Sequence, residues 1–531
     1  MVKEINLLSQ KIIDDKFSVD DIIKLILKNR HITNIDEFLK PSIPQIKLNL
    51  KPALKLIKNT INKNQNILIY GDYDVDGITA TAILWQAIHA NYPNIIPFIP
   101  HREIDGYGIK AKSFFRFQTE KNIKFDLLIT VDNGIVAGKE LQKIKDKQDI
   151  NIIITDHHLP NEDLQLVTRN CQPIHSSLVC GSAISYFLAK ELNKNVNLGL
   201  AALGTVADCL PLIGVNRSIV VHGLKQLNHN PSPGIKKLIQ ISSIQLPVTS
   251  YHLGFILGPR INAVGRLSDP TDALRLLCSH NENQASKYAQ VLNNFNQDRQ
   301  TIQKESLDIA DKNIDLKNKI IIIDGAYNPG IIGLIASRLT EKYYLPSIVI
   351  AVDGAIAKGS CRSIPELNII NVLRDYSDLF IDLGGHAGAA GFSIFTKNIT
   401  KLKKLITKSV NLKLEKINLQ PHLDVDAQMQ LTAVNLKNIK AIESLAPFGI
   451  GNEQPLFLFK NVIVESIRTI GQNNDHLKIK TNNIDCLFFK QGHLINKIKT
   501  GDSIDLVASL SLNEWNHTQS PQLIVKEIIT V

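Results

Sequence analysis

Three aspartates at alternate positions form the most chemically distinctive stretch of this 531-residue chain. Asp72, Asp74 and Asp76 follow the apolar run 66–70 and precede a helix-like stretch that begins near Ile78. The apolar run is typical of a buried parallel strand, so the carboxylates lie where ligands bind in open α/β sheets. Like charges at one strand end repel one another unless a cation or hydrogen bonds offset the repulsion. The stretch is therefore either a divalent-metal site or an Asp/Gly-rich turn with solvated carboxylates.

Further carboxylates and imidazoles follow two later apolar runs of the same kind. Residues 127–131 and 150–155 are short and β-branched, and each ends in polar side chains: Asp132, Asp156, His157 and His158. Asp208 adds one more carboxylate to an otherwise apolar segment. Parallel strands end at the same edge of a sheet, so these groups are expected to converge. Carboxylates with one or two imidazoles suit Mg²⁺ or Mn²⁺, and the imidazoles favour Mn²⁺.

Each motif alone has an ordinary explanation. The stretch 132–134 (Asp-Asn-Gly) could be a plain turn and Asp208 a helix cap, while a His-His pair is more often structural than metal-binding. Four acidic motifs, three of them at expected strand ends, favour one shared metal site.

The apolar runs also indicate the architecture, because 531 residues are too many for one compact core. Short runs with helical spacers predict a parallel, doubly wound α/β sheet with strands at 66–70, 94–99, 127–131 and 150–155. A stretch without Gly or Pro, 281–315, predicts a long connecting helix. The expected parts are a helical segment capping the first domain (1–63), the parallel-sheet domain (64–215), a helical connector (216–316), a second α/β domain (317–420) and a C-terminal β-barrel of the OB type built from about five strands (421–531).

Composition narrows the class of protein. The net charge of +10 favours polyanionic partners. Six scattered cysteines without a C-x-x-C pair indicate reduced thiols, so a cytoplasmic protein is expected. No apolar run reaches 18 residues, and the N-terminus lacks a secretory core, so neither a membrane span nor a leader is expected.

The motifs Asp-x-Asp-x-Asp-Gly, Val-Asp-Asn-Gly, Asp-His-His and Ala-Asp-x-x-Pro-Leu, in this order and spacing, resemble the DHH phosphoesterase superfamily. Within it, the chain most resembles the RecJ exonucleases beyond about residue 64. The resemblance implies a two-metal hydrolase that removes 5′-mononucleotides from the 5′ end of single-stranded DNA, in DNA repair and recombination. It also implies a helicase and a single-strand-binding protein as partners.

The resemblance also implies roles for the site residues. Its first ligands are Asp74, Asp76, Asp132, His157 and Asp208, with Asp132 bridging both ions. Asp72 is a further candidate ligand, and Asp156 is either a ligand or a group that orients a histidine. His158 is a ligand or the acid that assists the leaving group.

Basic and polar side chains outside the metal motifs are candidate phosphate contacts. Arg102 lies in a RecJ-like loop after the second strand, although it could instead pair with Glu103 or Asp105. A second RecJ-like stretch, 253–267, contributes Arg260, Asn262 and Arg266, for which helix capping and core packing are equal alternatives. In the second α/β domain the candidates are Arg362, Ser363 and His386.

The chain departs from the RecJ pattern in this second α/β domain. Tyr327 and Asn328 replace the usual Trp-His, and Cys361 interrupts a Gly-Ser-Gly-Arg-Ser pattern. In the C-terminal part, Lys478, Lys480, Phe488, Lys490 and Trp515 could bind a single strand, although the aromatic residues could equally be core residues.

Two other functions remain open from the sequence. One is a DHH phosphodiesterase acting on short RNA, cyclic dinucleotides or polyphosphate. The C-terminal barrel argues against this alternative, because a small substrate needs no extended strand-binding surface. The other is a scaffold that binds DNA without cutting it, which the intact set of carboxylates and histidines opposes.

Overall fold

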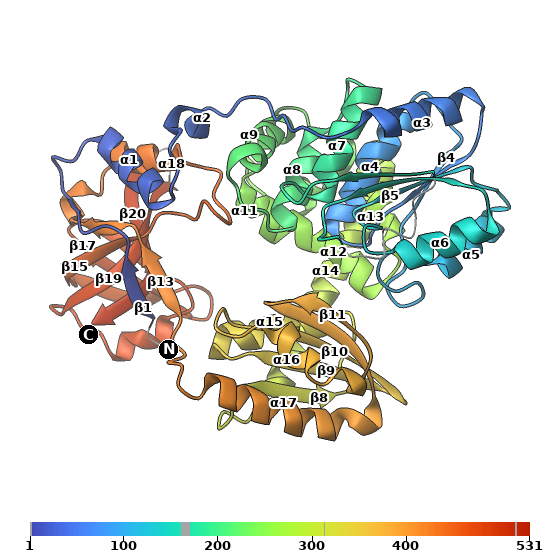
Figure 1. Cartoon of the computed structure of the whole chain (residues 1–531). Coiled ribbons are helices and arrows are strands. Elements are labelled where there is room, and N and C mark those ends of the chain that lie inside the picture. The colour runs from blue at the N-terminus through green and yellow to red at the C-terminus, as the bar shows by residue number, and fades with distance from the viewer. Residues whose placement is uncertain (1–2, 161–169, 313, 516–517, 531) are drawn as a thin grey trace. The chain divides into compact units, whose positions relative to one another are not determined.

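The computed structural model describes residues 3–160, 170–312, 314–515 and 518–530, with the side chains of Trp515 and Thr530 excepted. The chain divides into two compact units, shown in Figure 1. One unit is Leu7–Asn296 together with Val425–Val531, and the other is Met1–Asn6 together with Gln297–Asp424. The candidate role of Trp515 therefore falls outside the described side chains.

A five-stranded parallel sheet organises the first part of the larger unit. Its order is β4-β3-β5-β6-β7. The strands are β3 (Ile67–Tyr70), β4 (Ile95–Phe98), β5 (Leu127–Val131), β6 (Asn151–Asp156) and β7 (Cys171–His175). All residues of β3 and β5 are buried, which explains their continuous apolar sequences. The edge strand β7 was not predicted, because it contains Pro173 and too few β-branched residues.

Helices cover both faces of this sheet, as expected for a doubly wound fold (Figure 1). On one face lie α3 (Lys51–Asn62), α4 (Val75–His89), α7 (Gly181–Leu192) and α8 (Leu198–Ala207), and on the other lie α5 (Ala111–Lys121) and α6 (Gly138–Lys147). Helix α4 is buried on nearly every side between the sheet and α7, α8 and α13. It therefore has a sequence that is apolar all round and not on one stripe.

The connector is helical, as predicted. Its helices are α9 (Gly214–His229), α10 (Pro233–Ile241), α11 (Ser250–His252), the π-helix η2 (Leu253–Leu257), α12 (Gly258–Leu267), α13 (Thr271–Leu277) and α14 (Glu282–Asp311). The 30-residue α14 confirms the long helix expected from a stretch without Gly or Pro.

The smaller unit contains a mixed sheet of order β11-β12-β10-β9-β8. Its strands are β8 (Ile321–Gly325), β9 (Ser347–Asp353), β10 (Ile356–Arg362), β11 (Phe380–His386) and β12 (Ala389–Phe395). The helices of this unit are α15 (Ile332–Tyr343), α16 (Ile369–Arg374) and α17 (Ile399–Leu414). The short strands β1 (Glu4–Leu7) and β13 (His422–Val425) pair separately.

The C-terminal strands form an eight-stranded sheet of order β16-β17-β18-β20-β19-β15-β14-β2. The strands are β14 (Ala427–Met429), β15 (Phe457–Ile463), β16 (Ser466–Ile470), β17 (His476–Thr481), β18 (Ile484–Phe488), β19 (Ser503–Trp515) and β20 (Thr518–Thr530), with α18 (Leu436–Glu443) beside them. The five expected strands are all present, and β14 and β16 are additional.

Only the last part of the N-terminal segment packs on the first domain: α3 lies on the parallel sheet, whereas the residues before it pack in the C-terminal core. Strand β2 (Ile12–Ile13) pairs with β14 of the C-terminal sheet. Helices α1 (Val19–Asn29) and α2 (Ile35–Leu39) also contribute to the C-terminal core, through Ile22, Ile26 and Phe38. The amphipathic pattern predicted the two helices, but no local signal identified a partner more than 400 residues away.

No helix among the described residues is long and apolar enough to cross a membrane.

Candidate metal centre

The triple-aspartate loop connects β3 to α4 and turns all three carboxylates towards one edge of the parallel sheet. Asp74 is the N-cap of α4, and its Oδ1 accepts a hydrogen bond from the Gly77 N–H at 3.0 Å. Asp72 Oδ1 accepts the N–H of Tyr73 at 2.8 Å. The loop geometry is therefore stabilised by local hydrogen bonds that leave other carboxylate oxygens for a ligand.

Asp76 lies in the first turn of α4 and faces the N-terminus of α7. Its two oxygens accept the backbone N–H groups of Gly181 at 2.6 Å and Ser182 at 2.9 Å. A helix N-terminus favours negative charge, so α7 stabilises this buried carboxylate. The sequence reasoning missed this role of α7, whose only local signal is the Cys-Gly-Ser start.

Asp132 follows β5 in the left-handed region, with φ of 60°. Its backbone N–H donates to the Thr155 carbonyl at 2.8 Å, which ties it to the neighbouring strand. The side chain is only 2% exposed, and its Oδ1 has no hydrogen-bond partner. The ring of His157 lies 3.2 Å from this buried oxygen, and a carboxylate and an imidazole placed together suit a shared cation.

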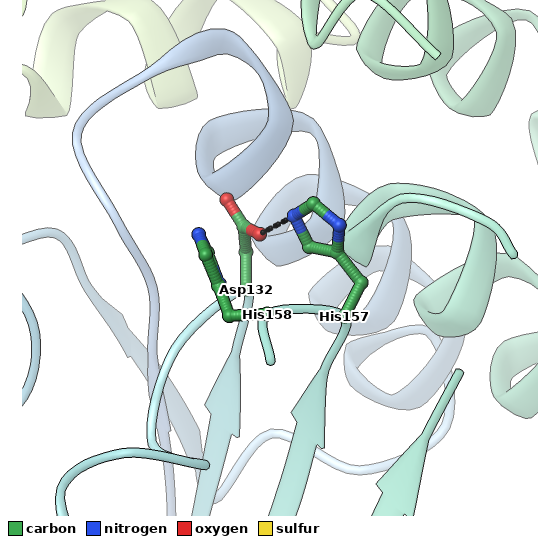
Figure 2. Close-up of side chains that lie close together, drawn as sticks. All are labelled: Asp132, His157 and His158. Carbon is green, nitrogen blue, oxygen red and sulfur yellow. Dashed lines mark ion pairs between the residues drawn. The ribbon is translucent and has the colours of Figure 1, made fainter. Parts of the chain in front are cut away.

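The two histidines follow β6 and have different surroundings, as Figure 2 shows beside Asp132. His157 Nε2 lies 3.2 Å from Asp132 Oδ1, 3.6 Å from Asp208 Oδ2 and 3.9 Å from Asp76 Oδ2. Burial lowers the pKa of His157, which favours the neutral imidazole that binds metals. His157 is therefore surrounded by carboxylates from three different elements.

His158 is held by Asp156 and Tyr107. Its Nδ1 lies 2.7 Å from Asp156 Oδ1, and its Nε2 lies 3.2 Å from the Tyr107 hydroxyl. Burial alone lowers the pKa of His158, but its hydrogen bond to Asp156 and the nearby carboxylates raise it to about 9. The imidazole is therefore protonated at neutral pH when no cation is bound.

Asp156 is occupied by donors on both oxygens. Its Oδ1 accepts the backbone N–H groups of His157 and His158 as well as the His158 ring, and its Oδ2 accepts the Ile135 N–H at 2.9 Å. Burial raises the pKa of this carboxyl, but the bonds from His158 more than offset it and lower the pKa. These contacts favour the orienting alternative for Asp156 over direct metal binding.

The ligand atoms form three groups whose members lie within 4.8 Å of one another: Asp72, Asp74 and Asp132; Asp132, His157 and His158; and Asp76, His157 and Asp208. Asp132 and His157 each belong to two groups, and of the two only a carboxylate has two oxygens with which to bridge a pair of ions. The oxygen-rich donors with imidazole fit Mn²⁺ or Mg²⁺. Asp208 is the C-cap of α8, as the helix-cap alternative expected, and its carboxylate also lies within reach of Asp76 and His157.

The carboxylates of the site interact strongly with one another. Burial, followed by the charges of neighbouring aspartates, raises the pKa of Asp72 and Asp208 to about 8. The same causes raise the pKa of Asp74 and raise that of Asp132 well above its ordinary value. Like charges this close cannot all ionise unless a cation compensates them.

Glycines allow the elements around the site to approach closely. A Cβ on Gly181 would lie 2.6 Å from the Asp132 Cβ, and one on Gly204 would lie 2.5 Å from Asp76 Oδ1. Both contacts are shorter than side chains tolerate. Helices α7 and α8 can therefore lie this close to the carboxylates only because glycine has no Cβ at these two positions.

The four candidate phosphate contacts of the larger unit have different surroundings. The Arg102 guanidinium lies 5.5 Å from the Tyr73 ring and lowers the pKa of Asp72, so it is close to the site. Its alternative partner Asp105 is paired with Arg116 at 2.6 Å. Asn262 instead caps α4 by accepting the Val75 N–H at 3.0 Å.

The two arginines of the 253–267 stretch differ from each other. Arg260 is held by the Asn293 side chain at 3.2 Å and the Ile256 carbonyl at 2.8 Å. Arg266 is close enough to Asp74 to lower its pKa. Arg266 therefore contributes positive charge at the carboxylates, whereas the contacts of Arg260 are those of packing.

In the smaller unit, Arg362 and His386 share one row of the sheet. Both pair with Ala389 of β12, from opposite sides, so their side chains project from the same face. Ser363 directly follows β10, and its hydroxyl donates to the Leu367 carbonyl at 2.7 Å. Cys361 points to the opposite face and is fully buried in the core, which explains why it is tolerated in the motif. Asn328 accepts the Gly330 N–H at 2.7 Å at the turn before α15.

Among the candidate strand-binding residues of the C-terminal sheet, some are buried or paired and others are exposed. Phe488 belongs to the core, and Lys478 pairs with Asp485 at 2.7 Å. Lys480 and Lys490 are exposed.

Three family models match the chain: the DHH family N-terminal domain at 66–210, the DHHA1 domain at 317–412 and the RecJ OB domain at 425–527. The single-stranded-DNA-specific exonuclease RecJ of Bacillus subtilis is 32% identical over 498 residues, which cover 90% of this chain and 63% of that protein. The chain thus spans less than two thirds of this relative. The Haemophilus influenzae protein of the same name is 28% identical, with 97% of each chain covered.

Solved structures show the same similarity. RecJ from Thermus thermophilus, crystallised in complex with Mn²⁺, matches with a TM-score of 0.85 and 25% identity over 99% of this chain and 79% of that one. An exonuclease RecJ bound to manganese matches with a TM-score of 0.61 and 29% identity, over 70% of this chain and 98% of that one. Both structures contain manganese, which is one of the metals that the carboxylate and histidine groups of this chain suit.

Proposed function

We propose, from the premise that the chain belongs to the RecJ group of the DHH family, that it is a metal-dependent exonuclease acting on single-stranded DNA. The observation that carries the proposal is the convergence of five aspartates and two histidines at one edge of the parallel sheet. The RecJ OB domain match supports the choice of a single strand as substrate.

The proposed metal ligands are Asp74, Asp76, Asp132, His157 and Asp208, with Asp72 completing the set. When bound, two divalent ions supply positive charge to the attacked phosphate and lower the pKa of a water molecule to near neutrality. Asp132 is the proposed shared ligand, because its carboxylate belongs to two of the three ligand groups and is almost fully buried among them. Asp156 positions His158 and does not bind an ion in this proposal.

His158 is the proposed acid for the leaving oxygen. Its Nδ1 is paired with Asp156, so the Nε2 beside Tyr107 is the nitrogen that can deliver a proton. Arg102 and Arg266 hold the substrate phosphate near the carboxylates. Arg362 and His386 form a second phosphate-binding row on their own sheet, while Ser363, Arg260 and Asn262 support the backbone around these contacts.

The finer features of the proposal rest on the resemblance of the motifs to the RecJ exonucleases. They are removal of 5′-mononucleotides from the 5′ end, a role in repair and recombination in the cytoplasm, and work beside a helicase and a single-strand-binding protein. The division of the chain into five parts, at the bounds given above, belongs to the same proposal.

The test uses a 3′-labelled single strand of about 30 nucleotides with Mn²⁺, a length that exceeds the site size of one OB fold. Asp132→Asn removes a charge while keeping a side chain that tolerates φ of 60°. Asp149→Asn, at an exposed position away from the site, is the matched control. The expected result is a ladder shortening from the 5′ end for wild type and control, and none for Asp132→Asn.

An intact strand in the wild-type reaction would refute the exonuclease. If a dinucleotide or polyphosphate were consumed instead, the metal chemistry would stand with a different substrate.

A further inference from the structure

Two exposed aromatic rings lie against each other on the helical connector. Tyr251 is 61% exposed and Phe255 is 72% exposed. Their ring centroids are 5.1 Å apart with an interplanar angle of 25°, so the rings are stacked. Single exposed apolar side chains are ordinary on protein surfaces, but a stacked pair presents a flat aromatic surface.

Both rings belong to one continuous helical segment, α11 followed by η2. Tyr251 lies in α11 and Phe255 four residues later in η2, on one face of the helical segment, while Leu253 and Leu257 are fully buried on the opposite side. A capping box of Thr249 and His252 fixes the start of the segment. Short π-helical stretches within α-helices, such as η2, are frequent at functional sites.

The helical segment that carries the pair contacts the loop into the C-terminal strands at one end and a neighbour of Asp208 at the other. On one side, the hydroxyl of Ser250 donates to the Phe448 carbonyl at 2.6 Å, in the loop that leads into the C-terminal strands. On the other side, a Cβ on Gly258 would lie 3.7 Å from the Cβ of Ala207, the neighbour of Asp208. A strand passing from the C-terminal domain to Asp208 would therefore pass near the two rings.

We propose that Tyr251 and Phe255 form a stacking platform for the bases of the single strand on its way to the metal centre. The inference rests on the proposed function, and it adds a substrate-binding site outside the metal motifs. Stacking suits an exonuclease that must accept any sequence, because every base has a π-face. Two rings are a small surface compared with the roughly 800 Å² that each partner buries in a stable protein interface, which favours bases over a protein partner.

The test measures binding and not cleavage. A fluorescent single strand of about 20 nucleotides, longer than the site size of one OB fold, is titrated with protein in EDTA, so that hydrolysis cannot contribute. The variants are Y251A/F255A, the ring-retaining Tyr251→Phe, and Ile43→Ala as a control at a residue that is 61% exposed. The same titrations use a strand of equal length and charge in which the bases are replaced by abasic sites.

The double variant removes the platform for one stacked base, so it is expected to bind the intact strand about 5- to 150-fold more weakly, since base–aromatic stacking is worth roughly 1–3 kcal/mol per base. Tyr251→Phe and Ile43→Ala should bind like wild type. On the abasic strand, wild type and double variant should bind equally, because no base remains to stack.

Two outcomes would overturn the platform: equal affinity of wild type and double variant for the intact strand, or an equal loss on both strands. The first would leave the rings to a protein partner, and the second would mean that the substitutions disturb backbone contacts. Because binding is measured without turnover, a chain that binds this way but fails to cut DNA would refute only the proposed activity.

Discussion

At the scale of single residues, the two histidines of the Asp-His-His motif have separate tasks although they are neighbours in sequence. His157 contacts carboxylates from α4, β5 and α8, whereas His158 is bound to Asp156 and Tyr107. The two rings lie side by side just after β6, with centroids 4.5 Å apart, yet they have different partners. Asp156 then serves as the common support, because its Oδ1 accepts from both backbone N–H groups.

Replacing Asp156 with Asn tests this supporting role. The amide keeps the shape but removes the charge that holds His158 protonated, so activity or Mn²⁺ affinity should fall about 10- to 100-fold. The measurement is the initial rate against Mn²⁺ concentration, together with its pH profile. Activity close to that of wild type and an unchanged pH profile would contradict the role.

The raised pKa values predict how stability changes with pH in the absence of metal. Asp72 and Asp208 have pKa values of about 8 in the fold, against about 3.9 in an unfolded chain. Between these values the folded state binds more protons than the unfolded state, so stability falls as pH rises towards about 8. In EDTA, the Tm should therefore be lower at about pH 8.5 than at about pH 6.

Saturating Mn²⁺ should reverse this trend, because the ion compensates the carboxylate charges and competes with protons. The gain in Tm on adding Mn²⁺ should be larger at about pH 8.5 than at about pH 6, and it should shrink in Asp132→Asn. An equal gain at both pH values would show that these carboxylates do not exchange protons for the ion.

At the scale of elements, the N-terminus of α7 matters as much as the loop that carries the aspartates. Gly181 donates its N–H to Asp76 and lies so close to Asp132 that no side chain fits between them. The N-terminus of α7 thus positions two carboxylates: Asp76 in the helix after β3, and Asp132 at the end of β5. The positive end of the helix also offsets part of their charge.

Gly181→Ala should displace Asp132 and raise the Mn²⁺ concentration needed for half-maximal activity about tenfold or more. Gly223→Ala is the matched control, since its Cβ would lie 2.4 Å from Ala202 in the packing of α9 against α8. The control should lower the Tm while leaving the Mn²⁺ dependence unchanged. Equal Mn²⁺ curves for Gly181→Ala and wild type would argue against positioning by α7.

At the scale of the whole molecule, one buried arginine joins three regions of the larger unit that are far apart in sequence. Arg217 on α9 is 1% exposed and donates to the carbonyls of Phe38, Ala446 and Pro447. Its guanidinium also lies 3.7 Å from the centroid of the Phe38 ring. The N-terminal segment, the connector and the loop into the C-terminal strands are therefore linked at one side chain.

Arg217→Met should lower the Tm by about 5 °C or more, because three buried carbonyls lose their donor. Protease cleavage near 446–452 should also become faster than in wild type. Arg275→Met, which removes an exposed pair with Asp272, should change neither result. A Tm within about 1 °C of wild type for Arg217→Met would show that the link is dispensable.

By itself, the sequence determined the chemistry and most of the architecture. Buried parallel strands are continuously apolar, so local composition was enough to predict β3, β5 and β6. It also predicted that carboxylates follow the ends of these strands. The same holds for α14 and for the five expected C-terminal strands, whose periodicity is a local property. The metal-ligand types followed from the residues alone.

Only the tertiary structure decided which donors meet and which are already occupied. The side chains of Asp156 and Asn262 already accept hydrogen bonds from the backbone. The N-terminus of α7 donates to Asp76, and the N-terminal helices α1 and α2 pack in the C-terminal core. Each of these contacts joins segments whose pairing depends on how the elements pack, and packing is not encoded in the composition of either segment. The stacked pair of Tyr251 and Phe255 belongs to the same class, because helical spacing places two rings on one face but exposure depends on what covers that face.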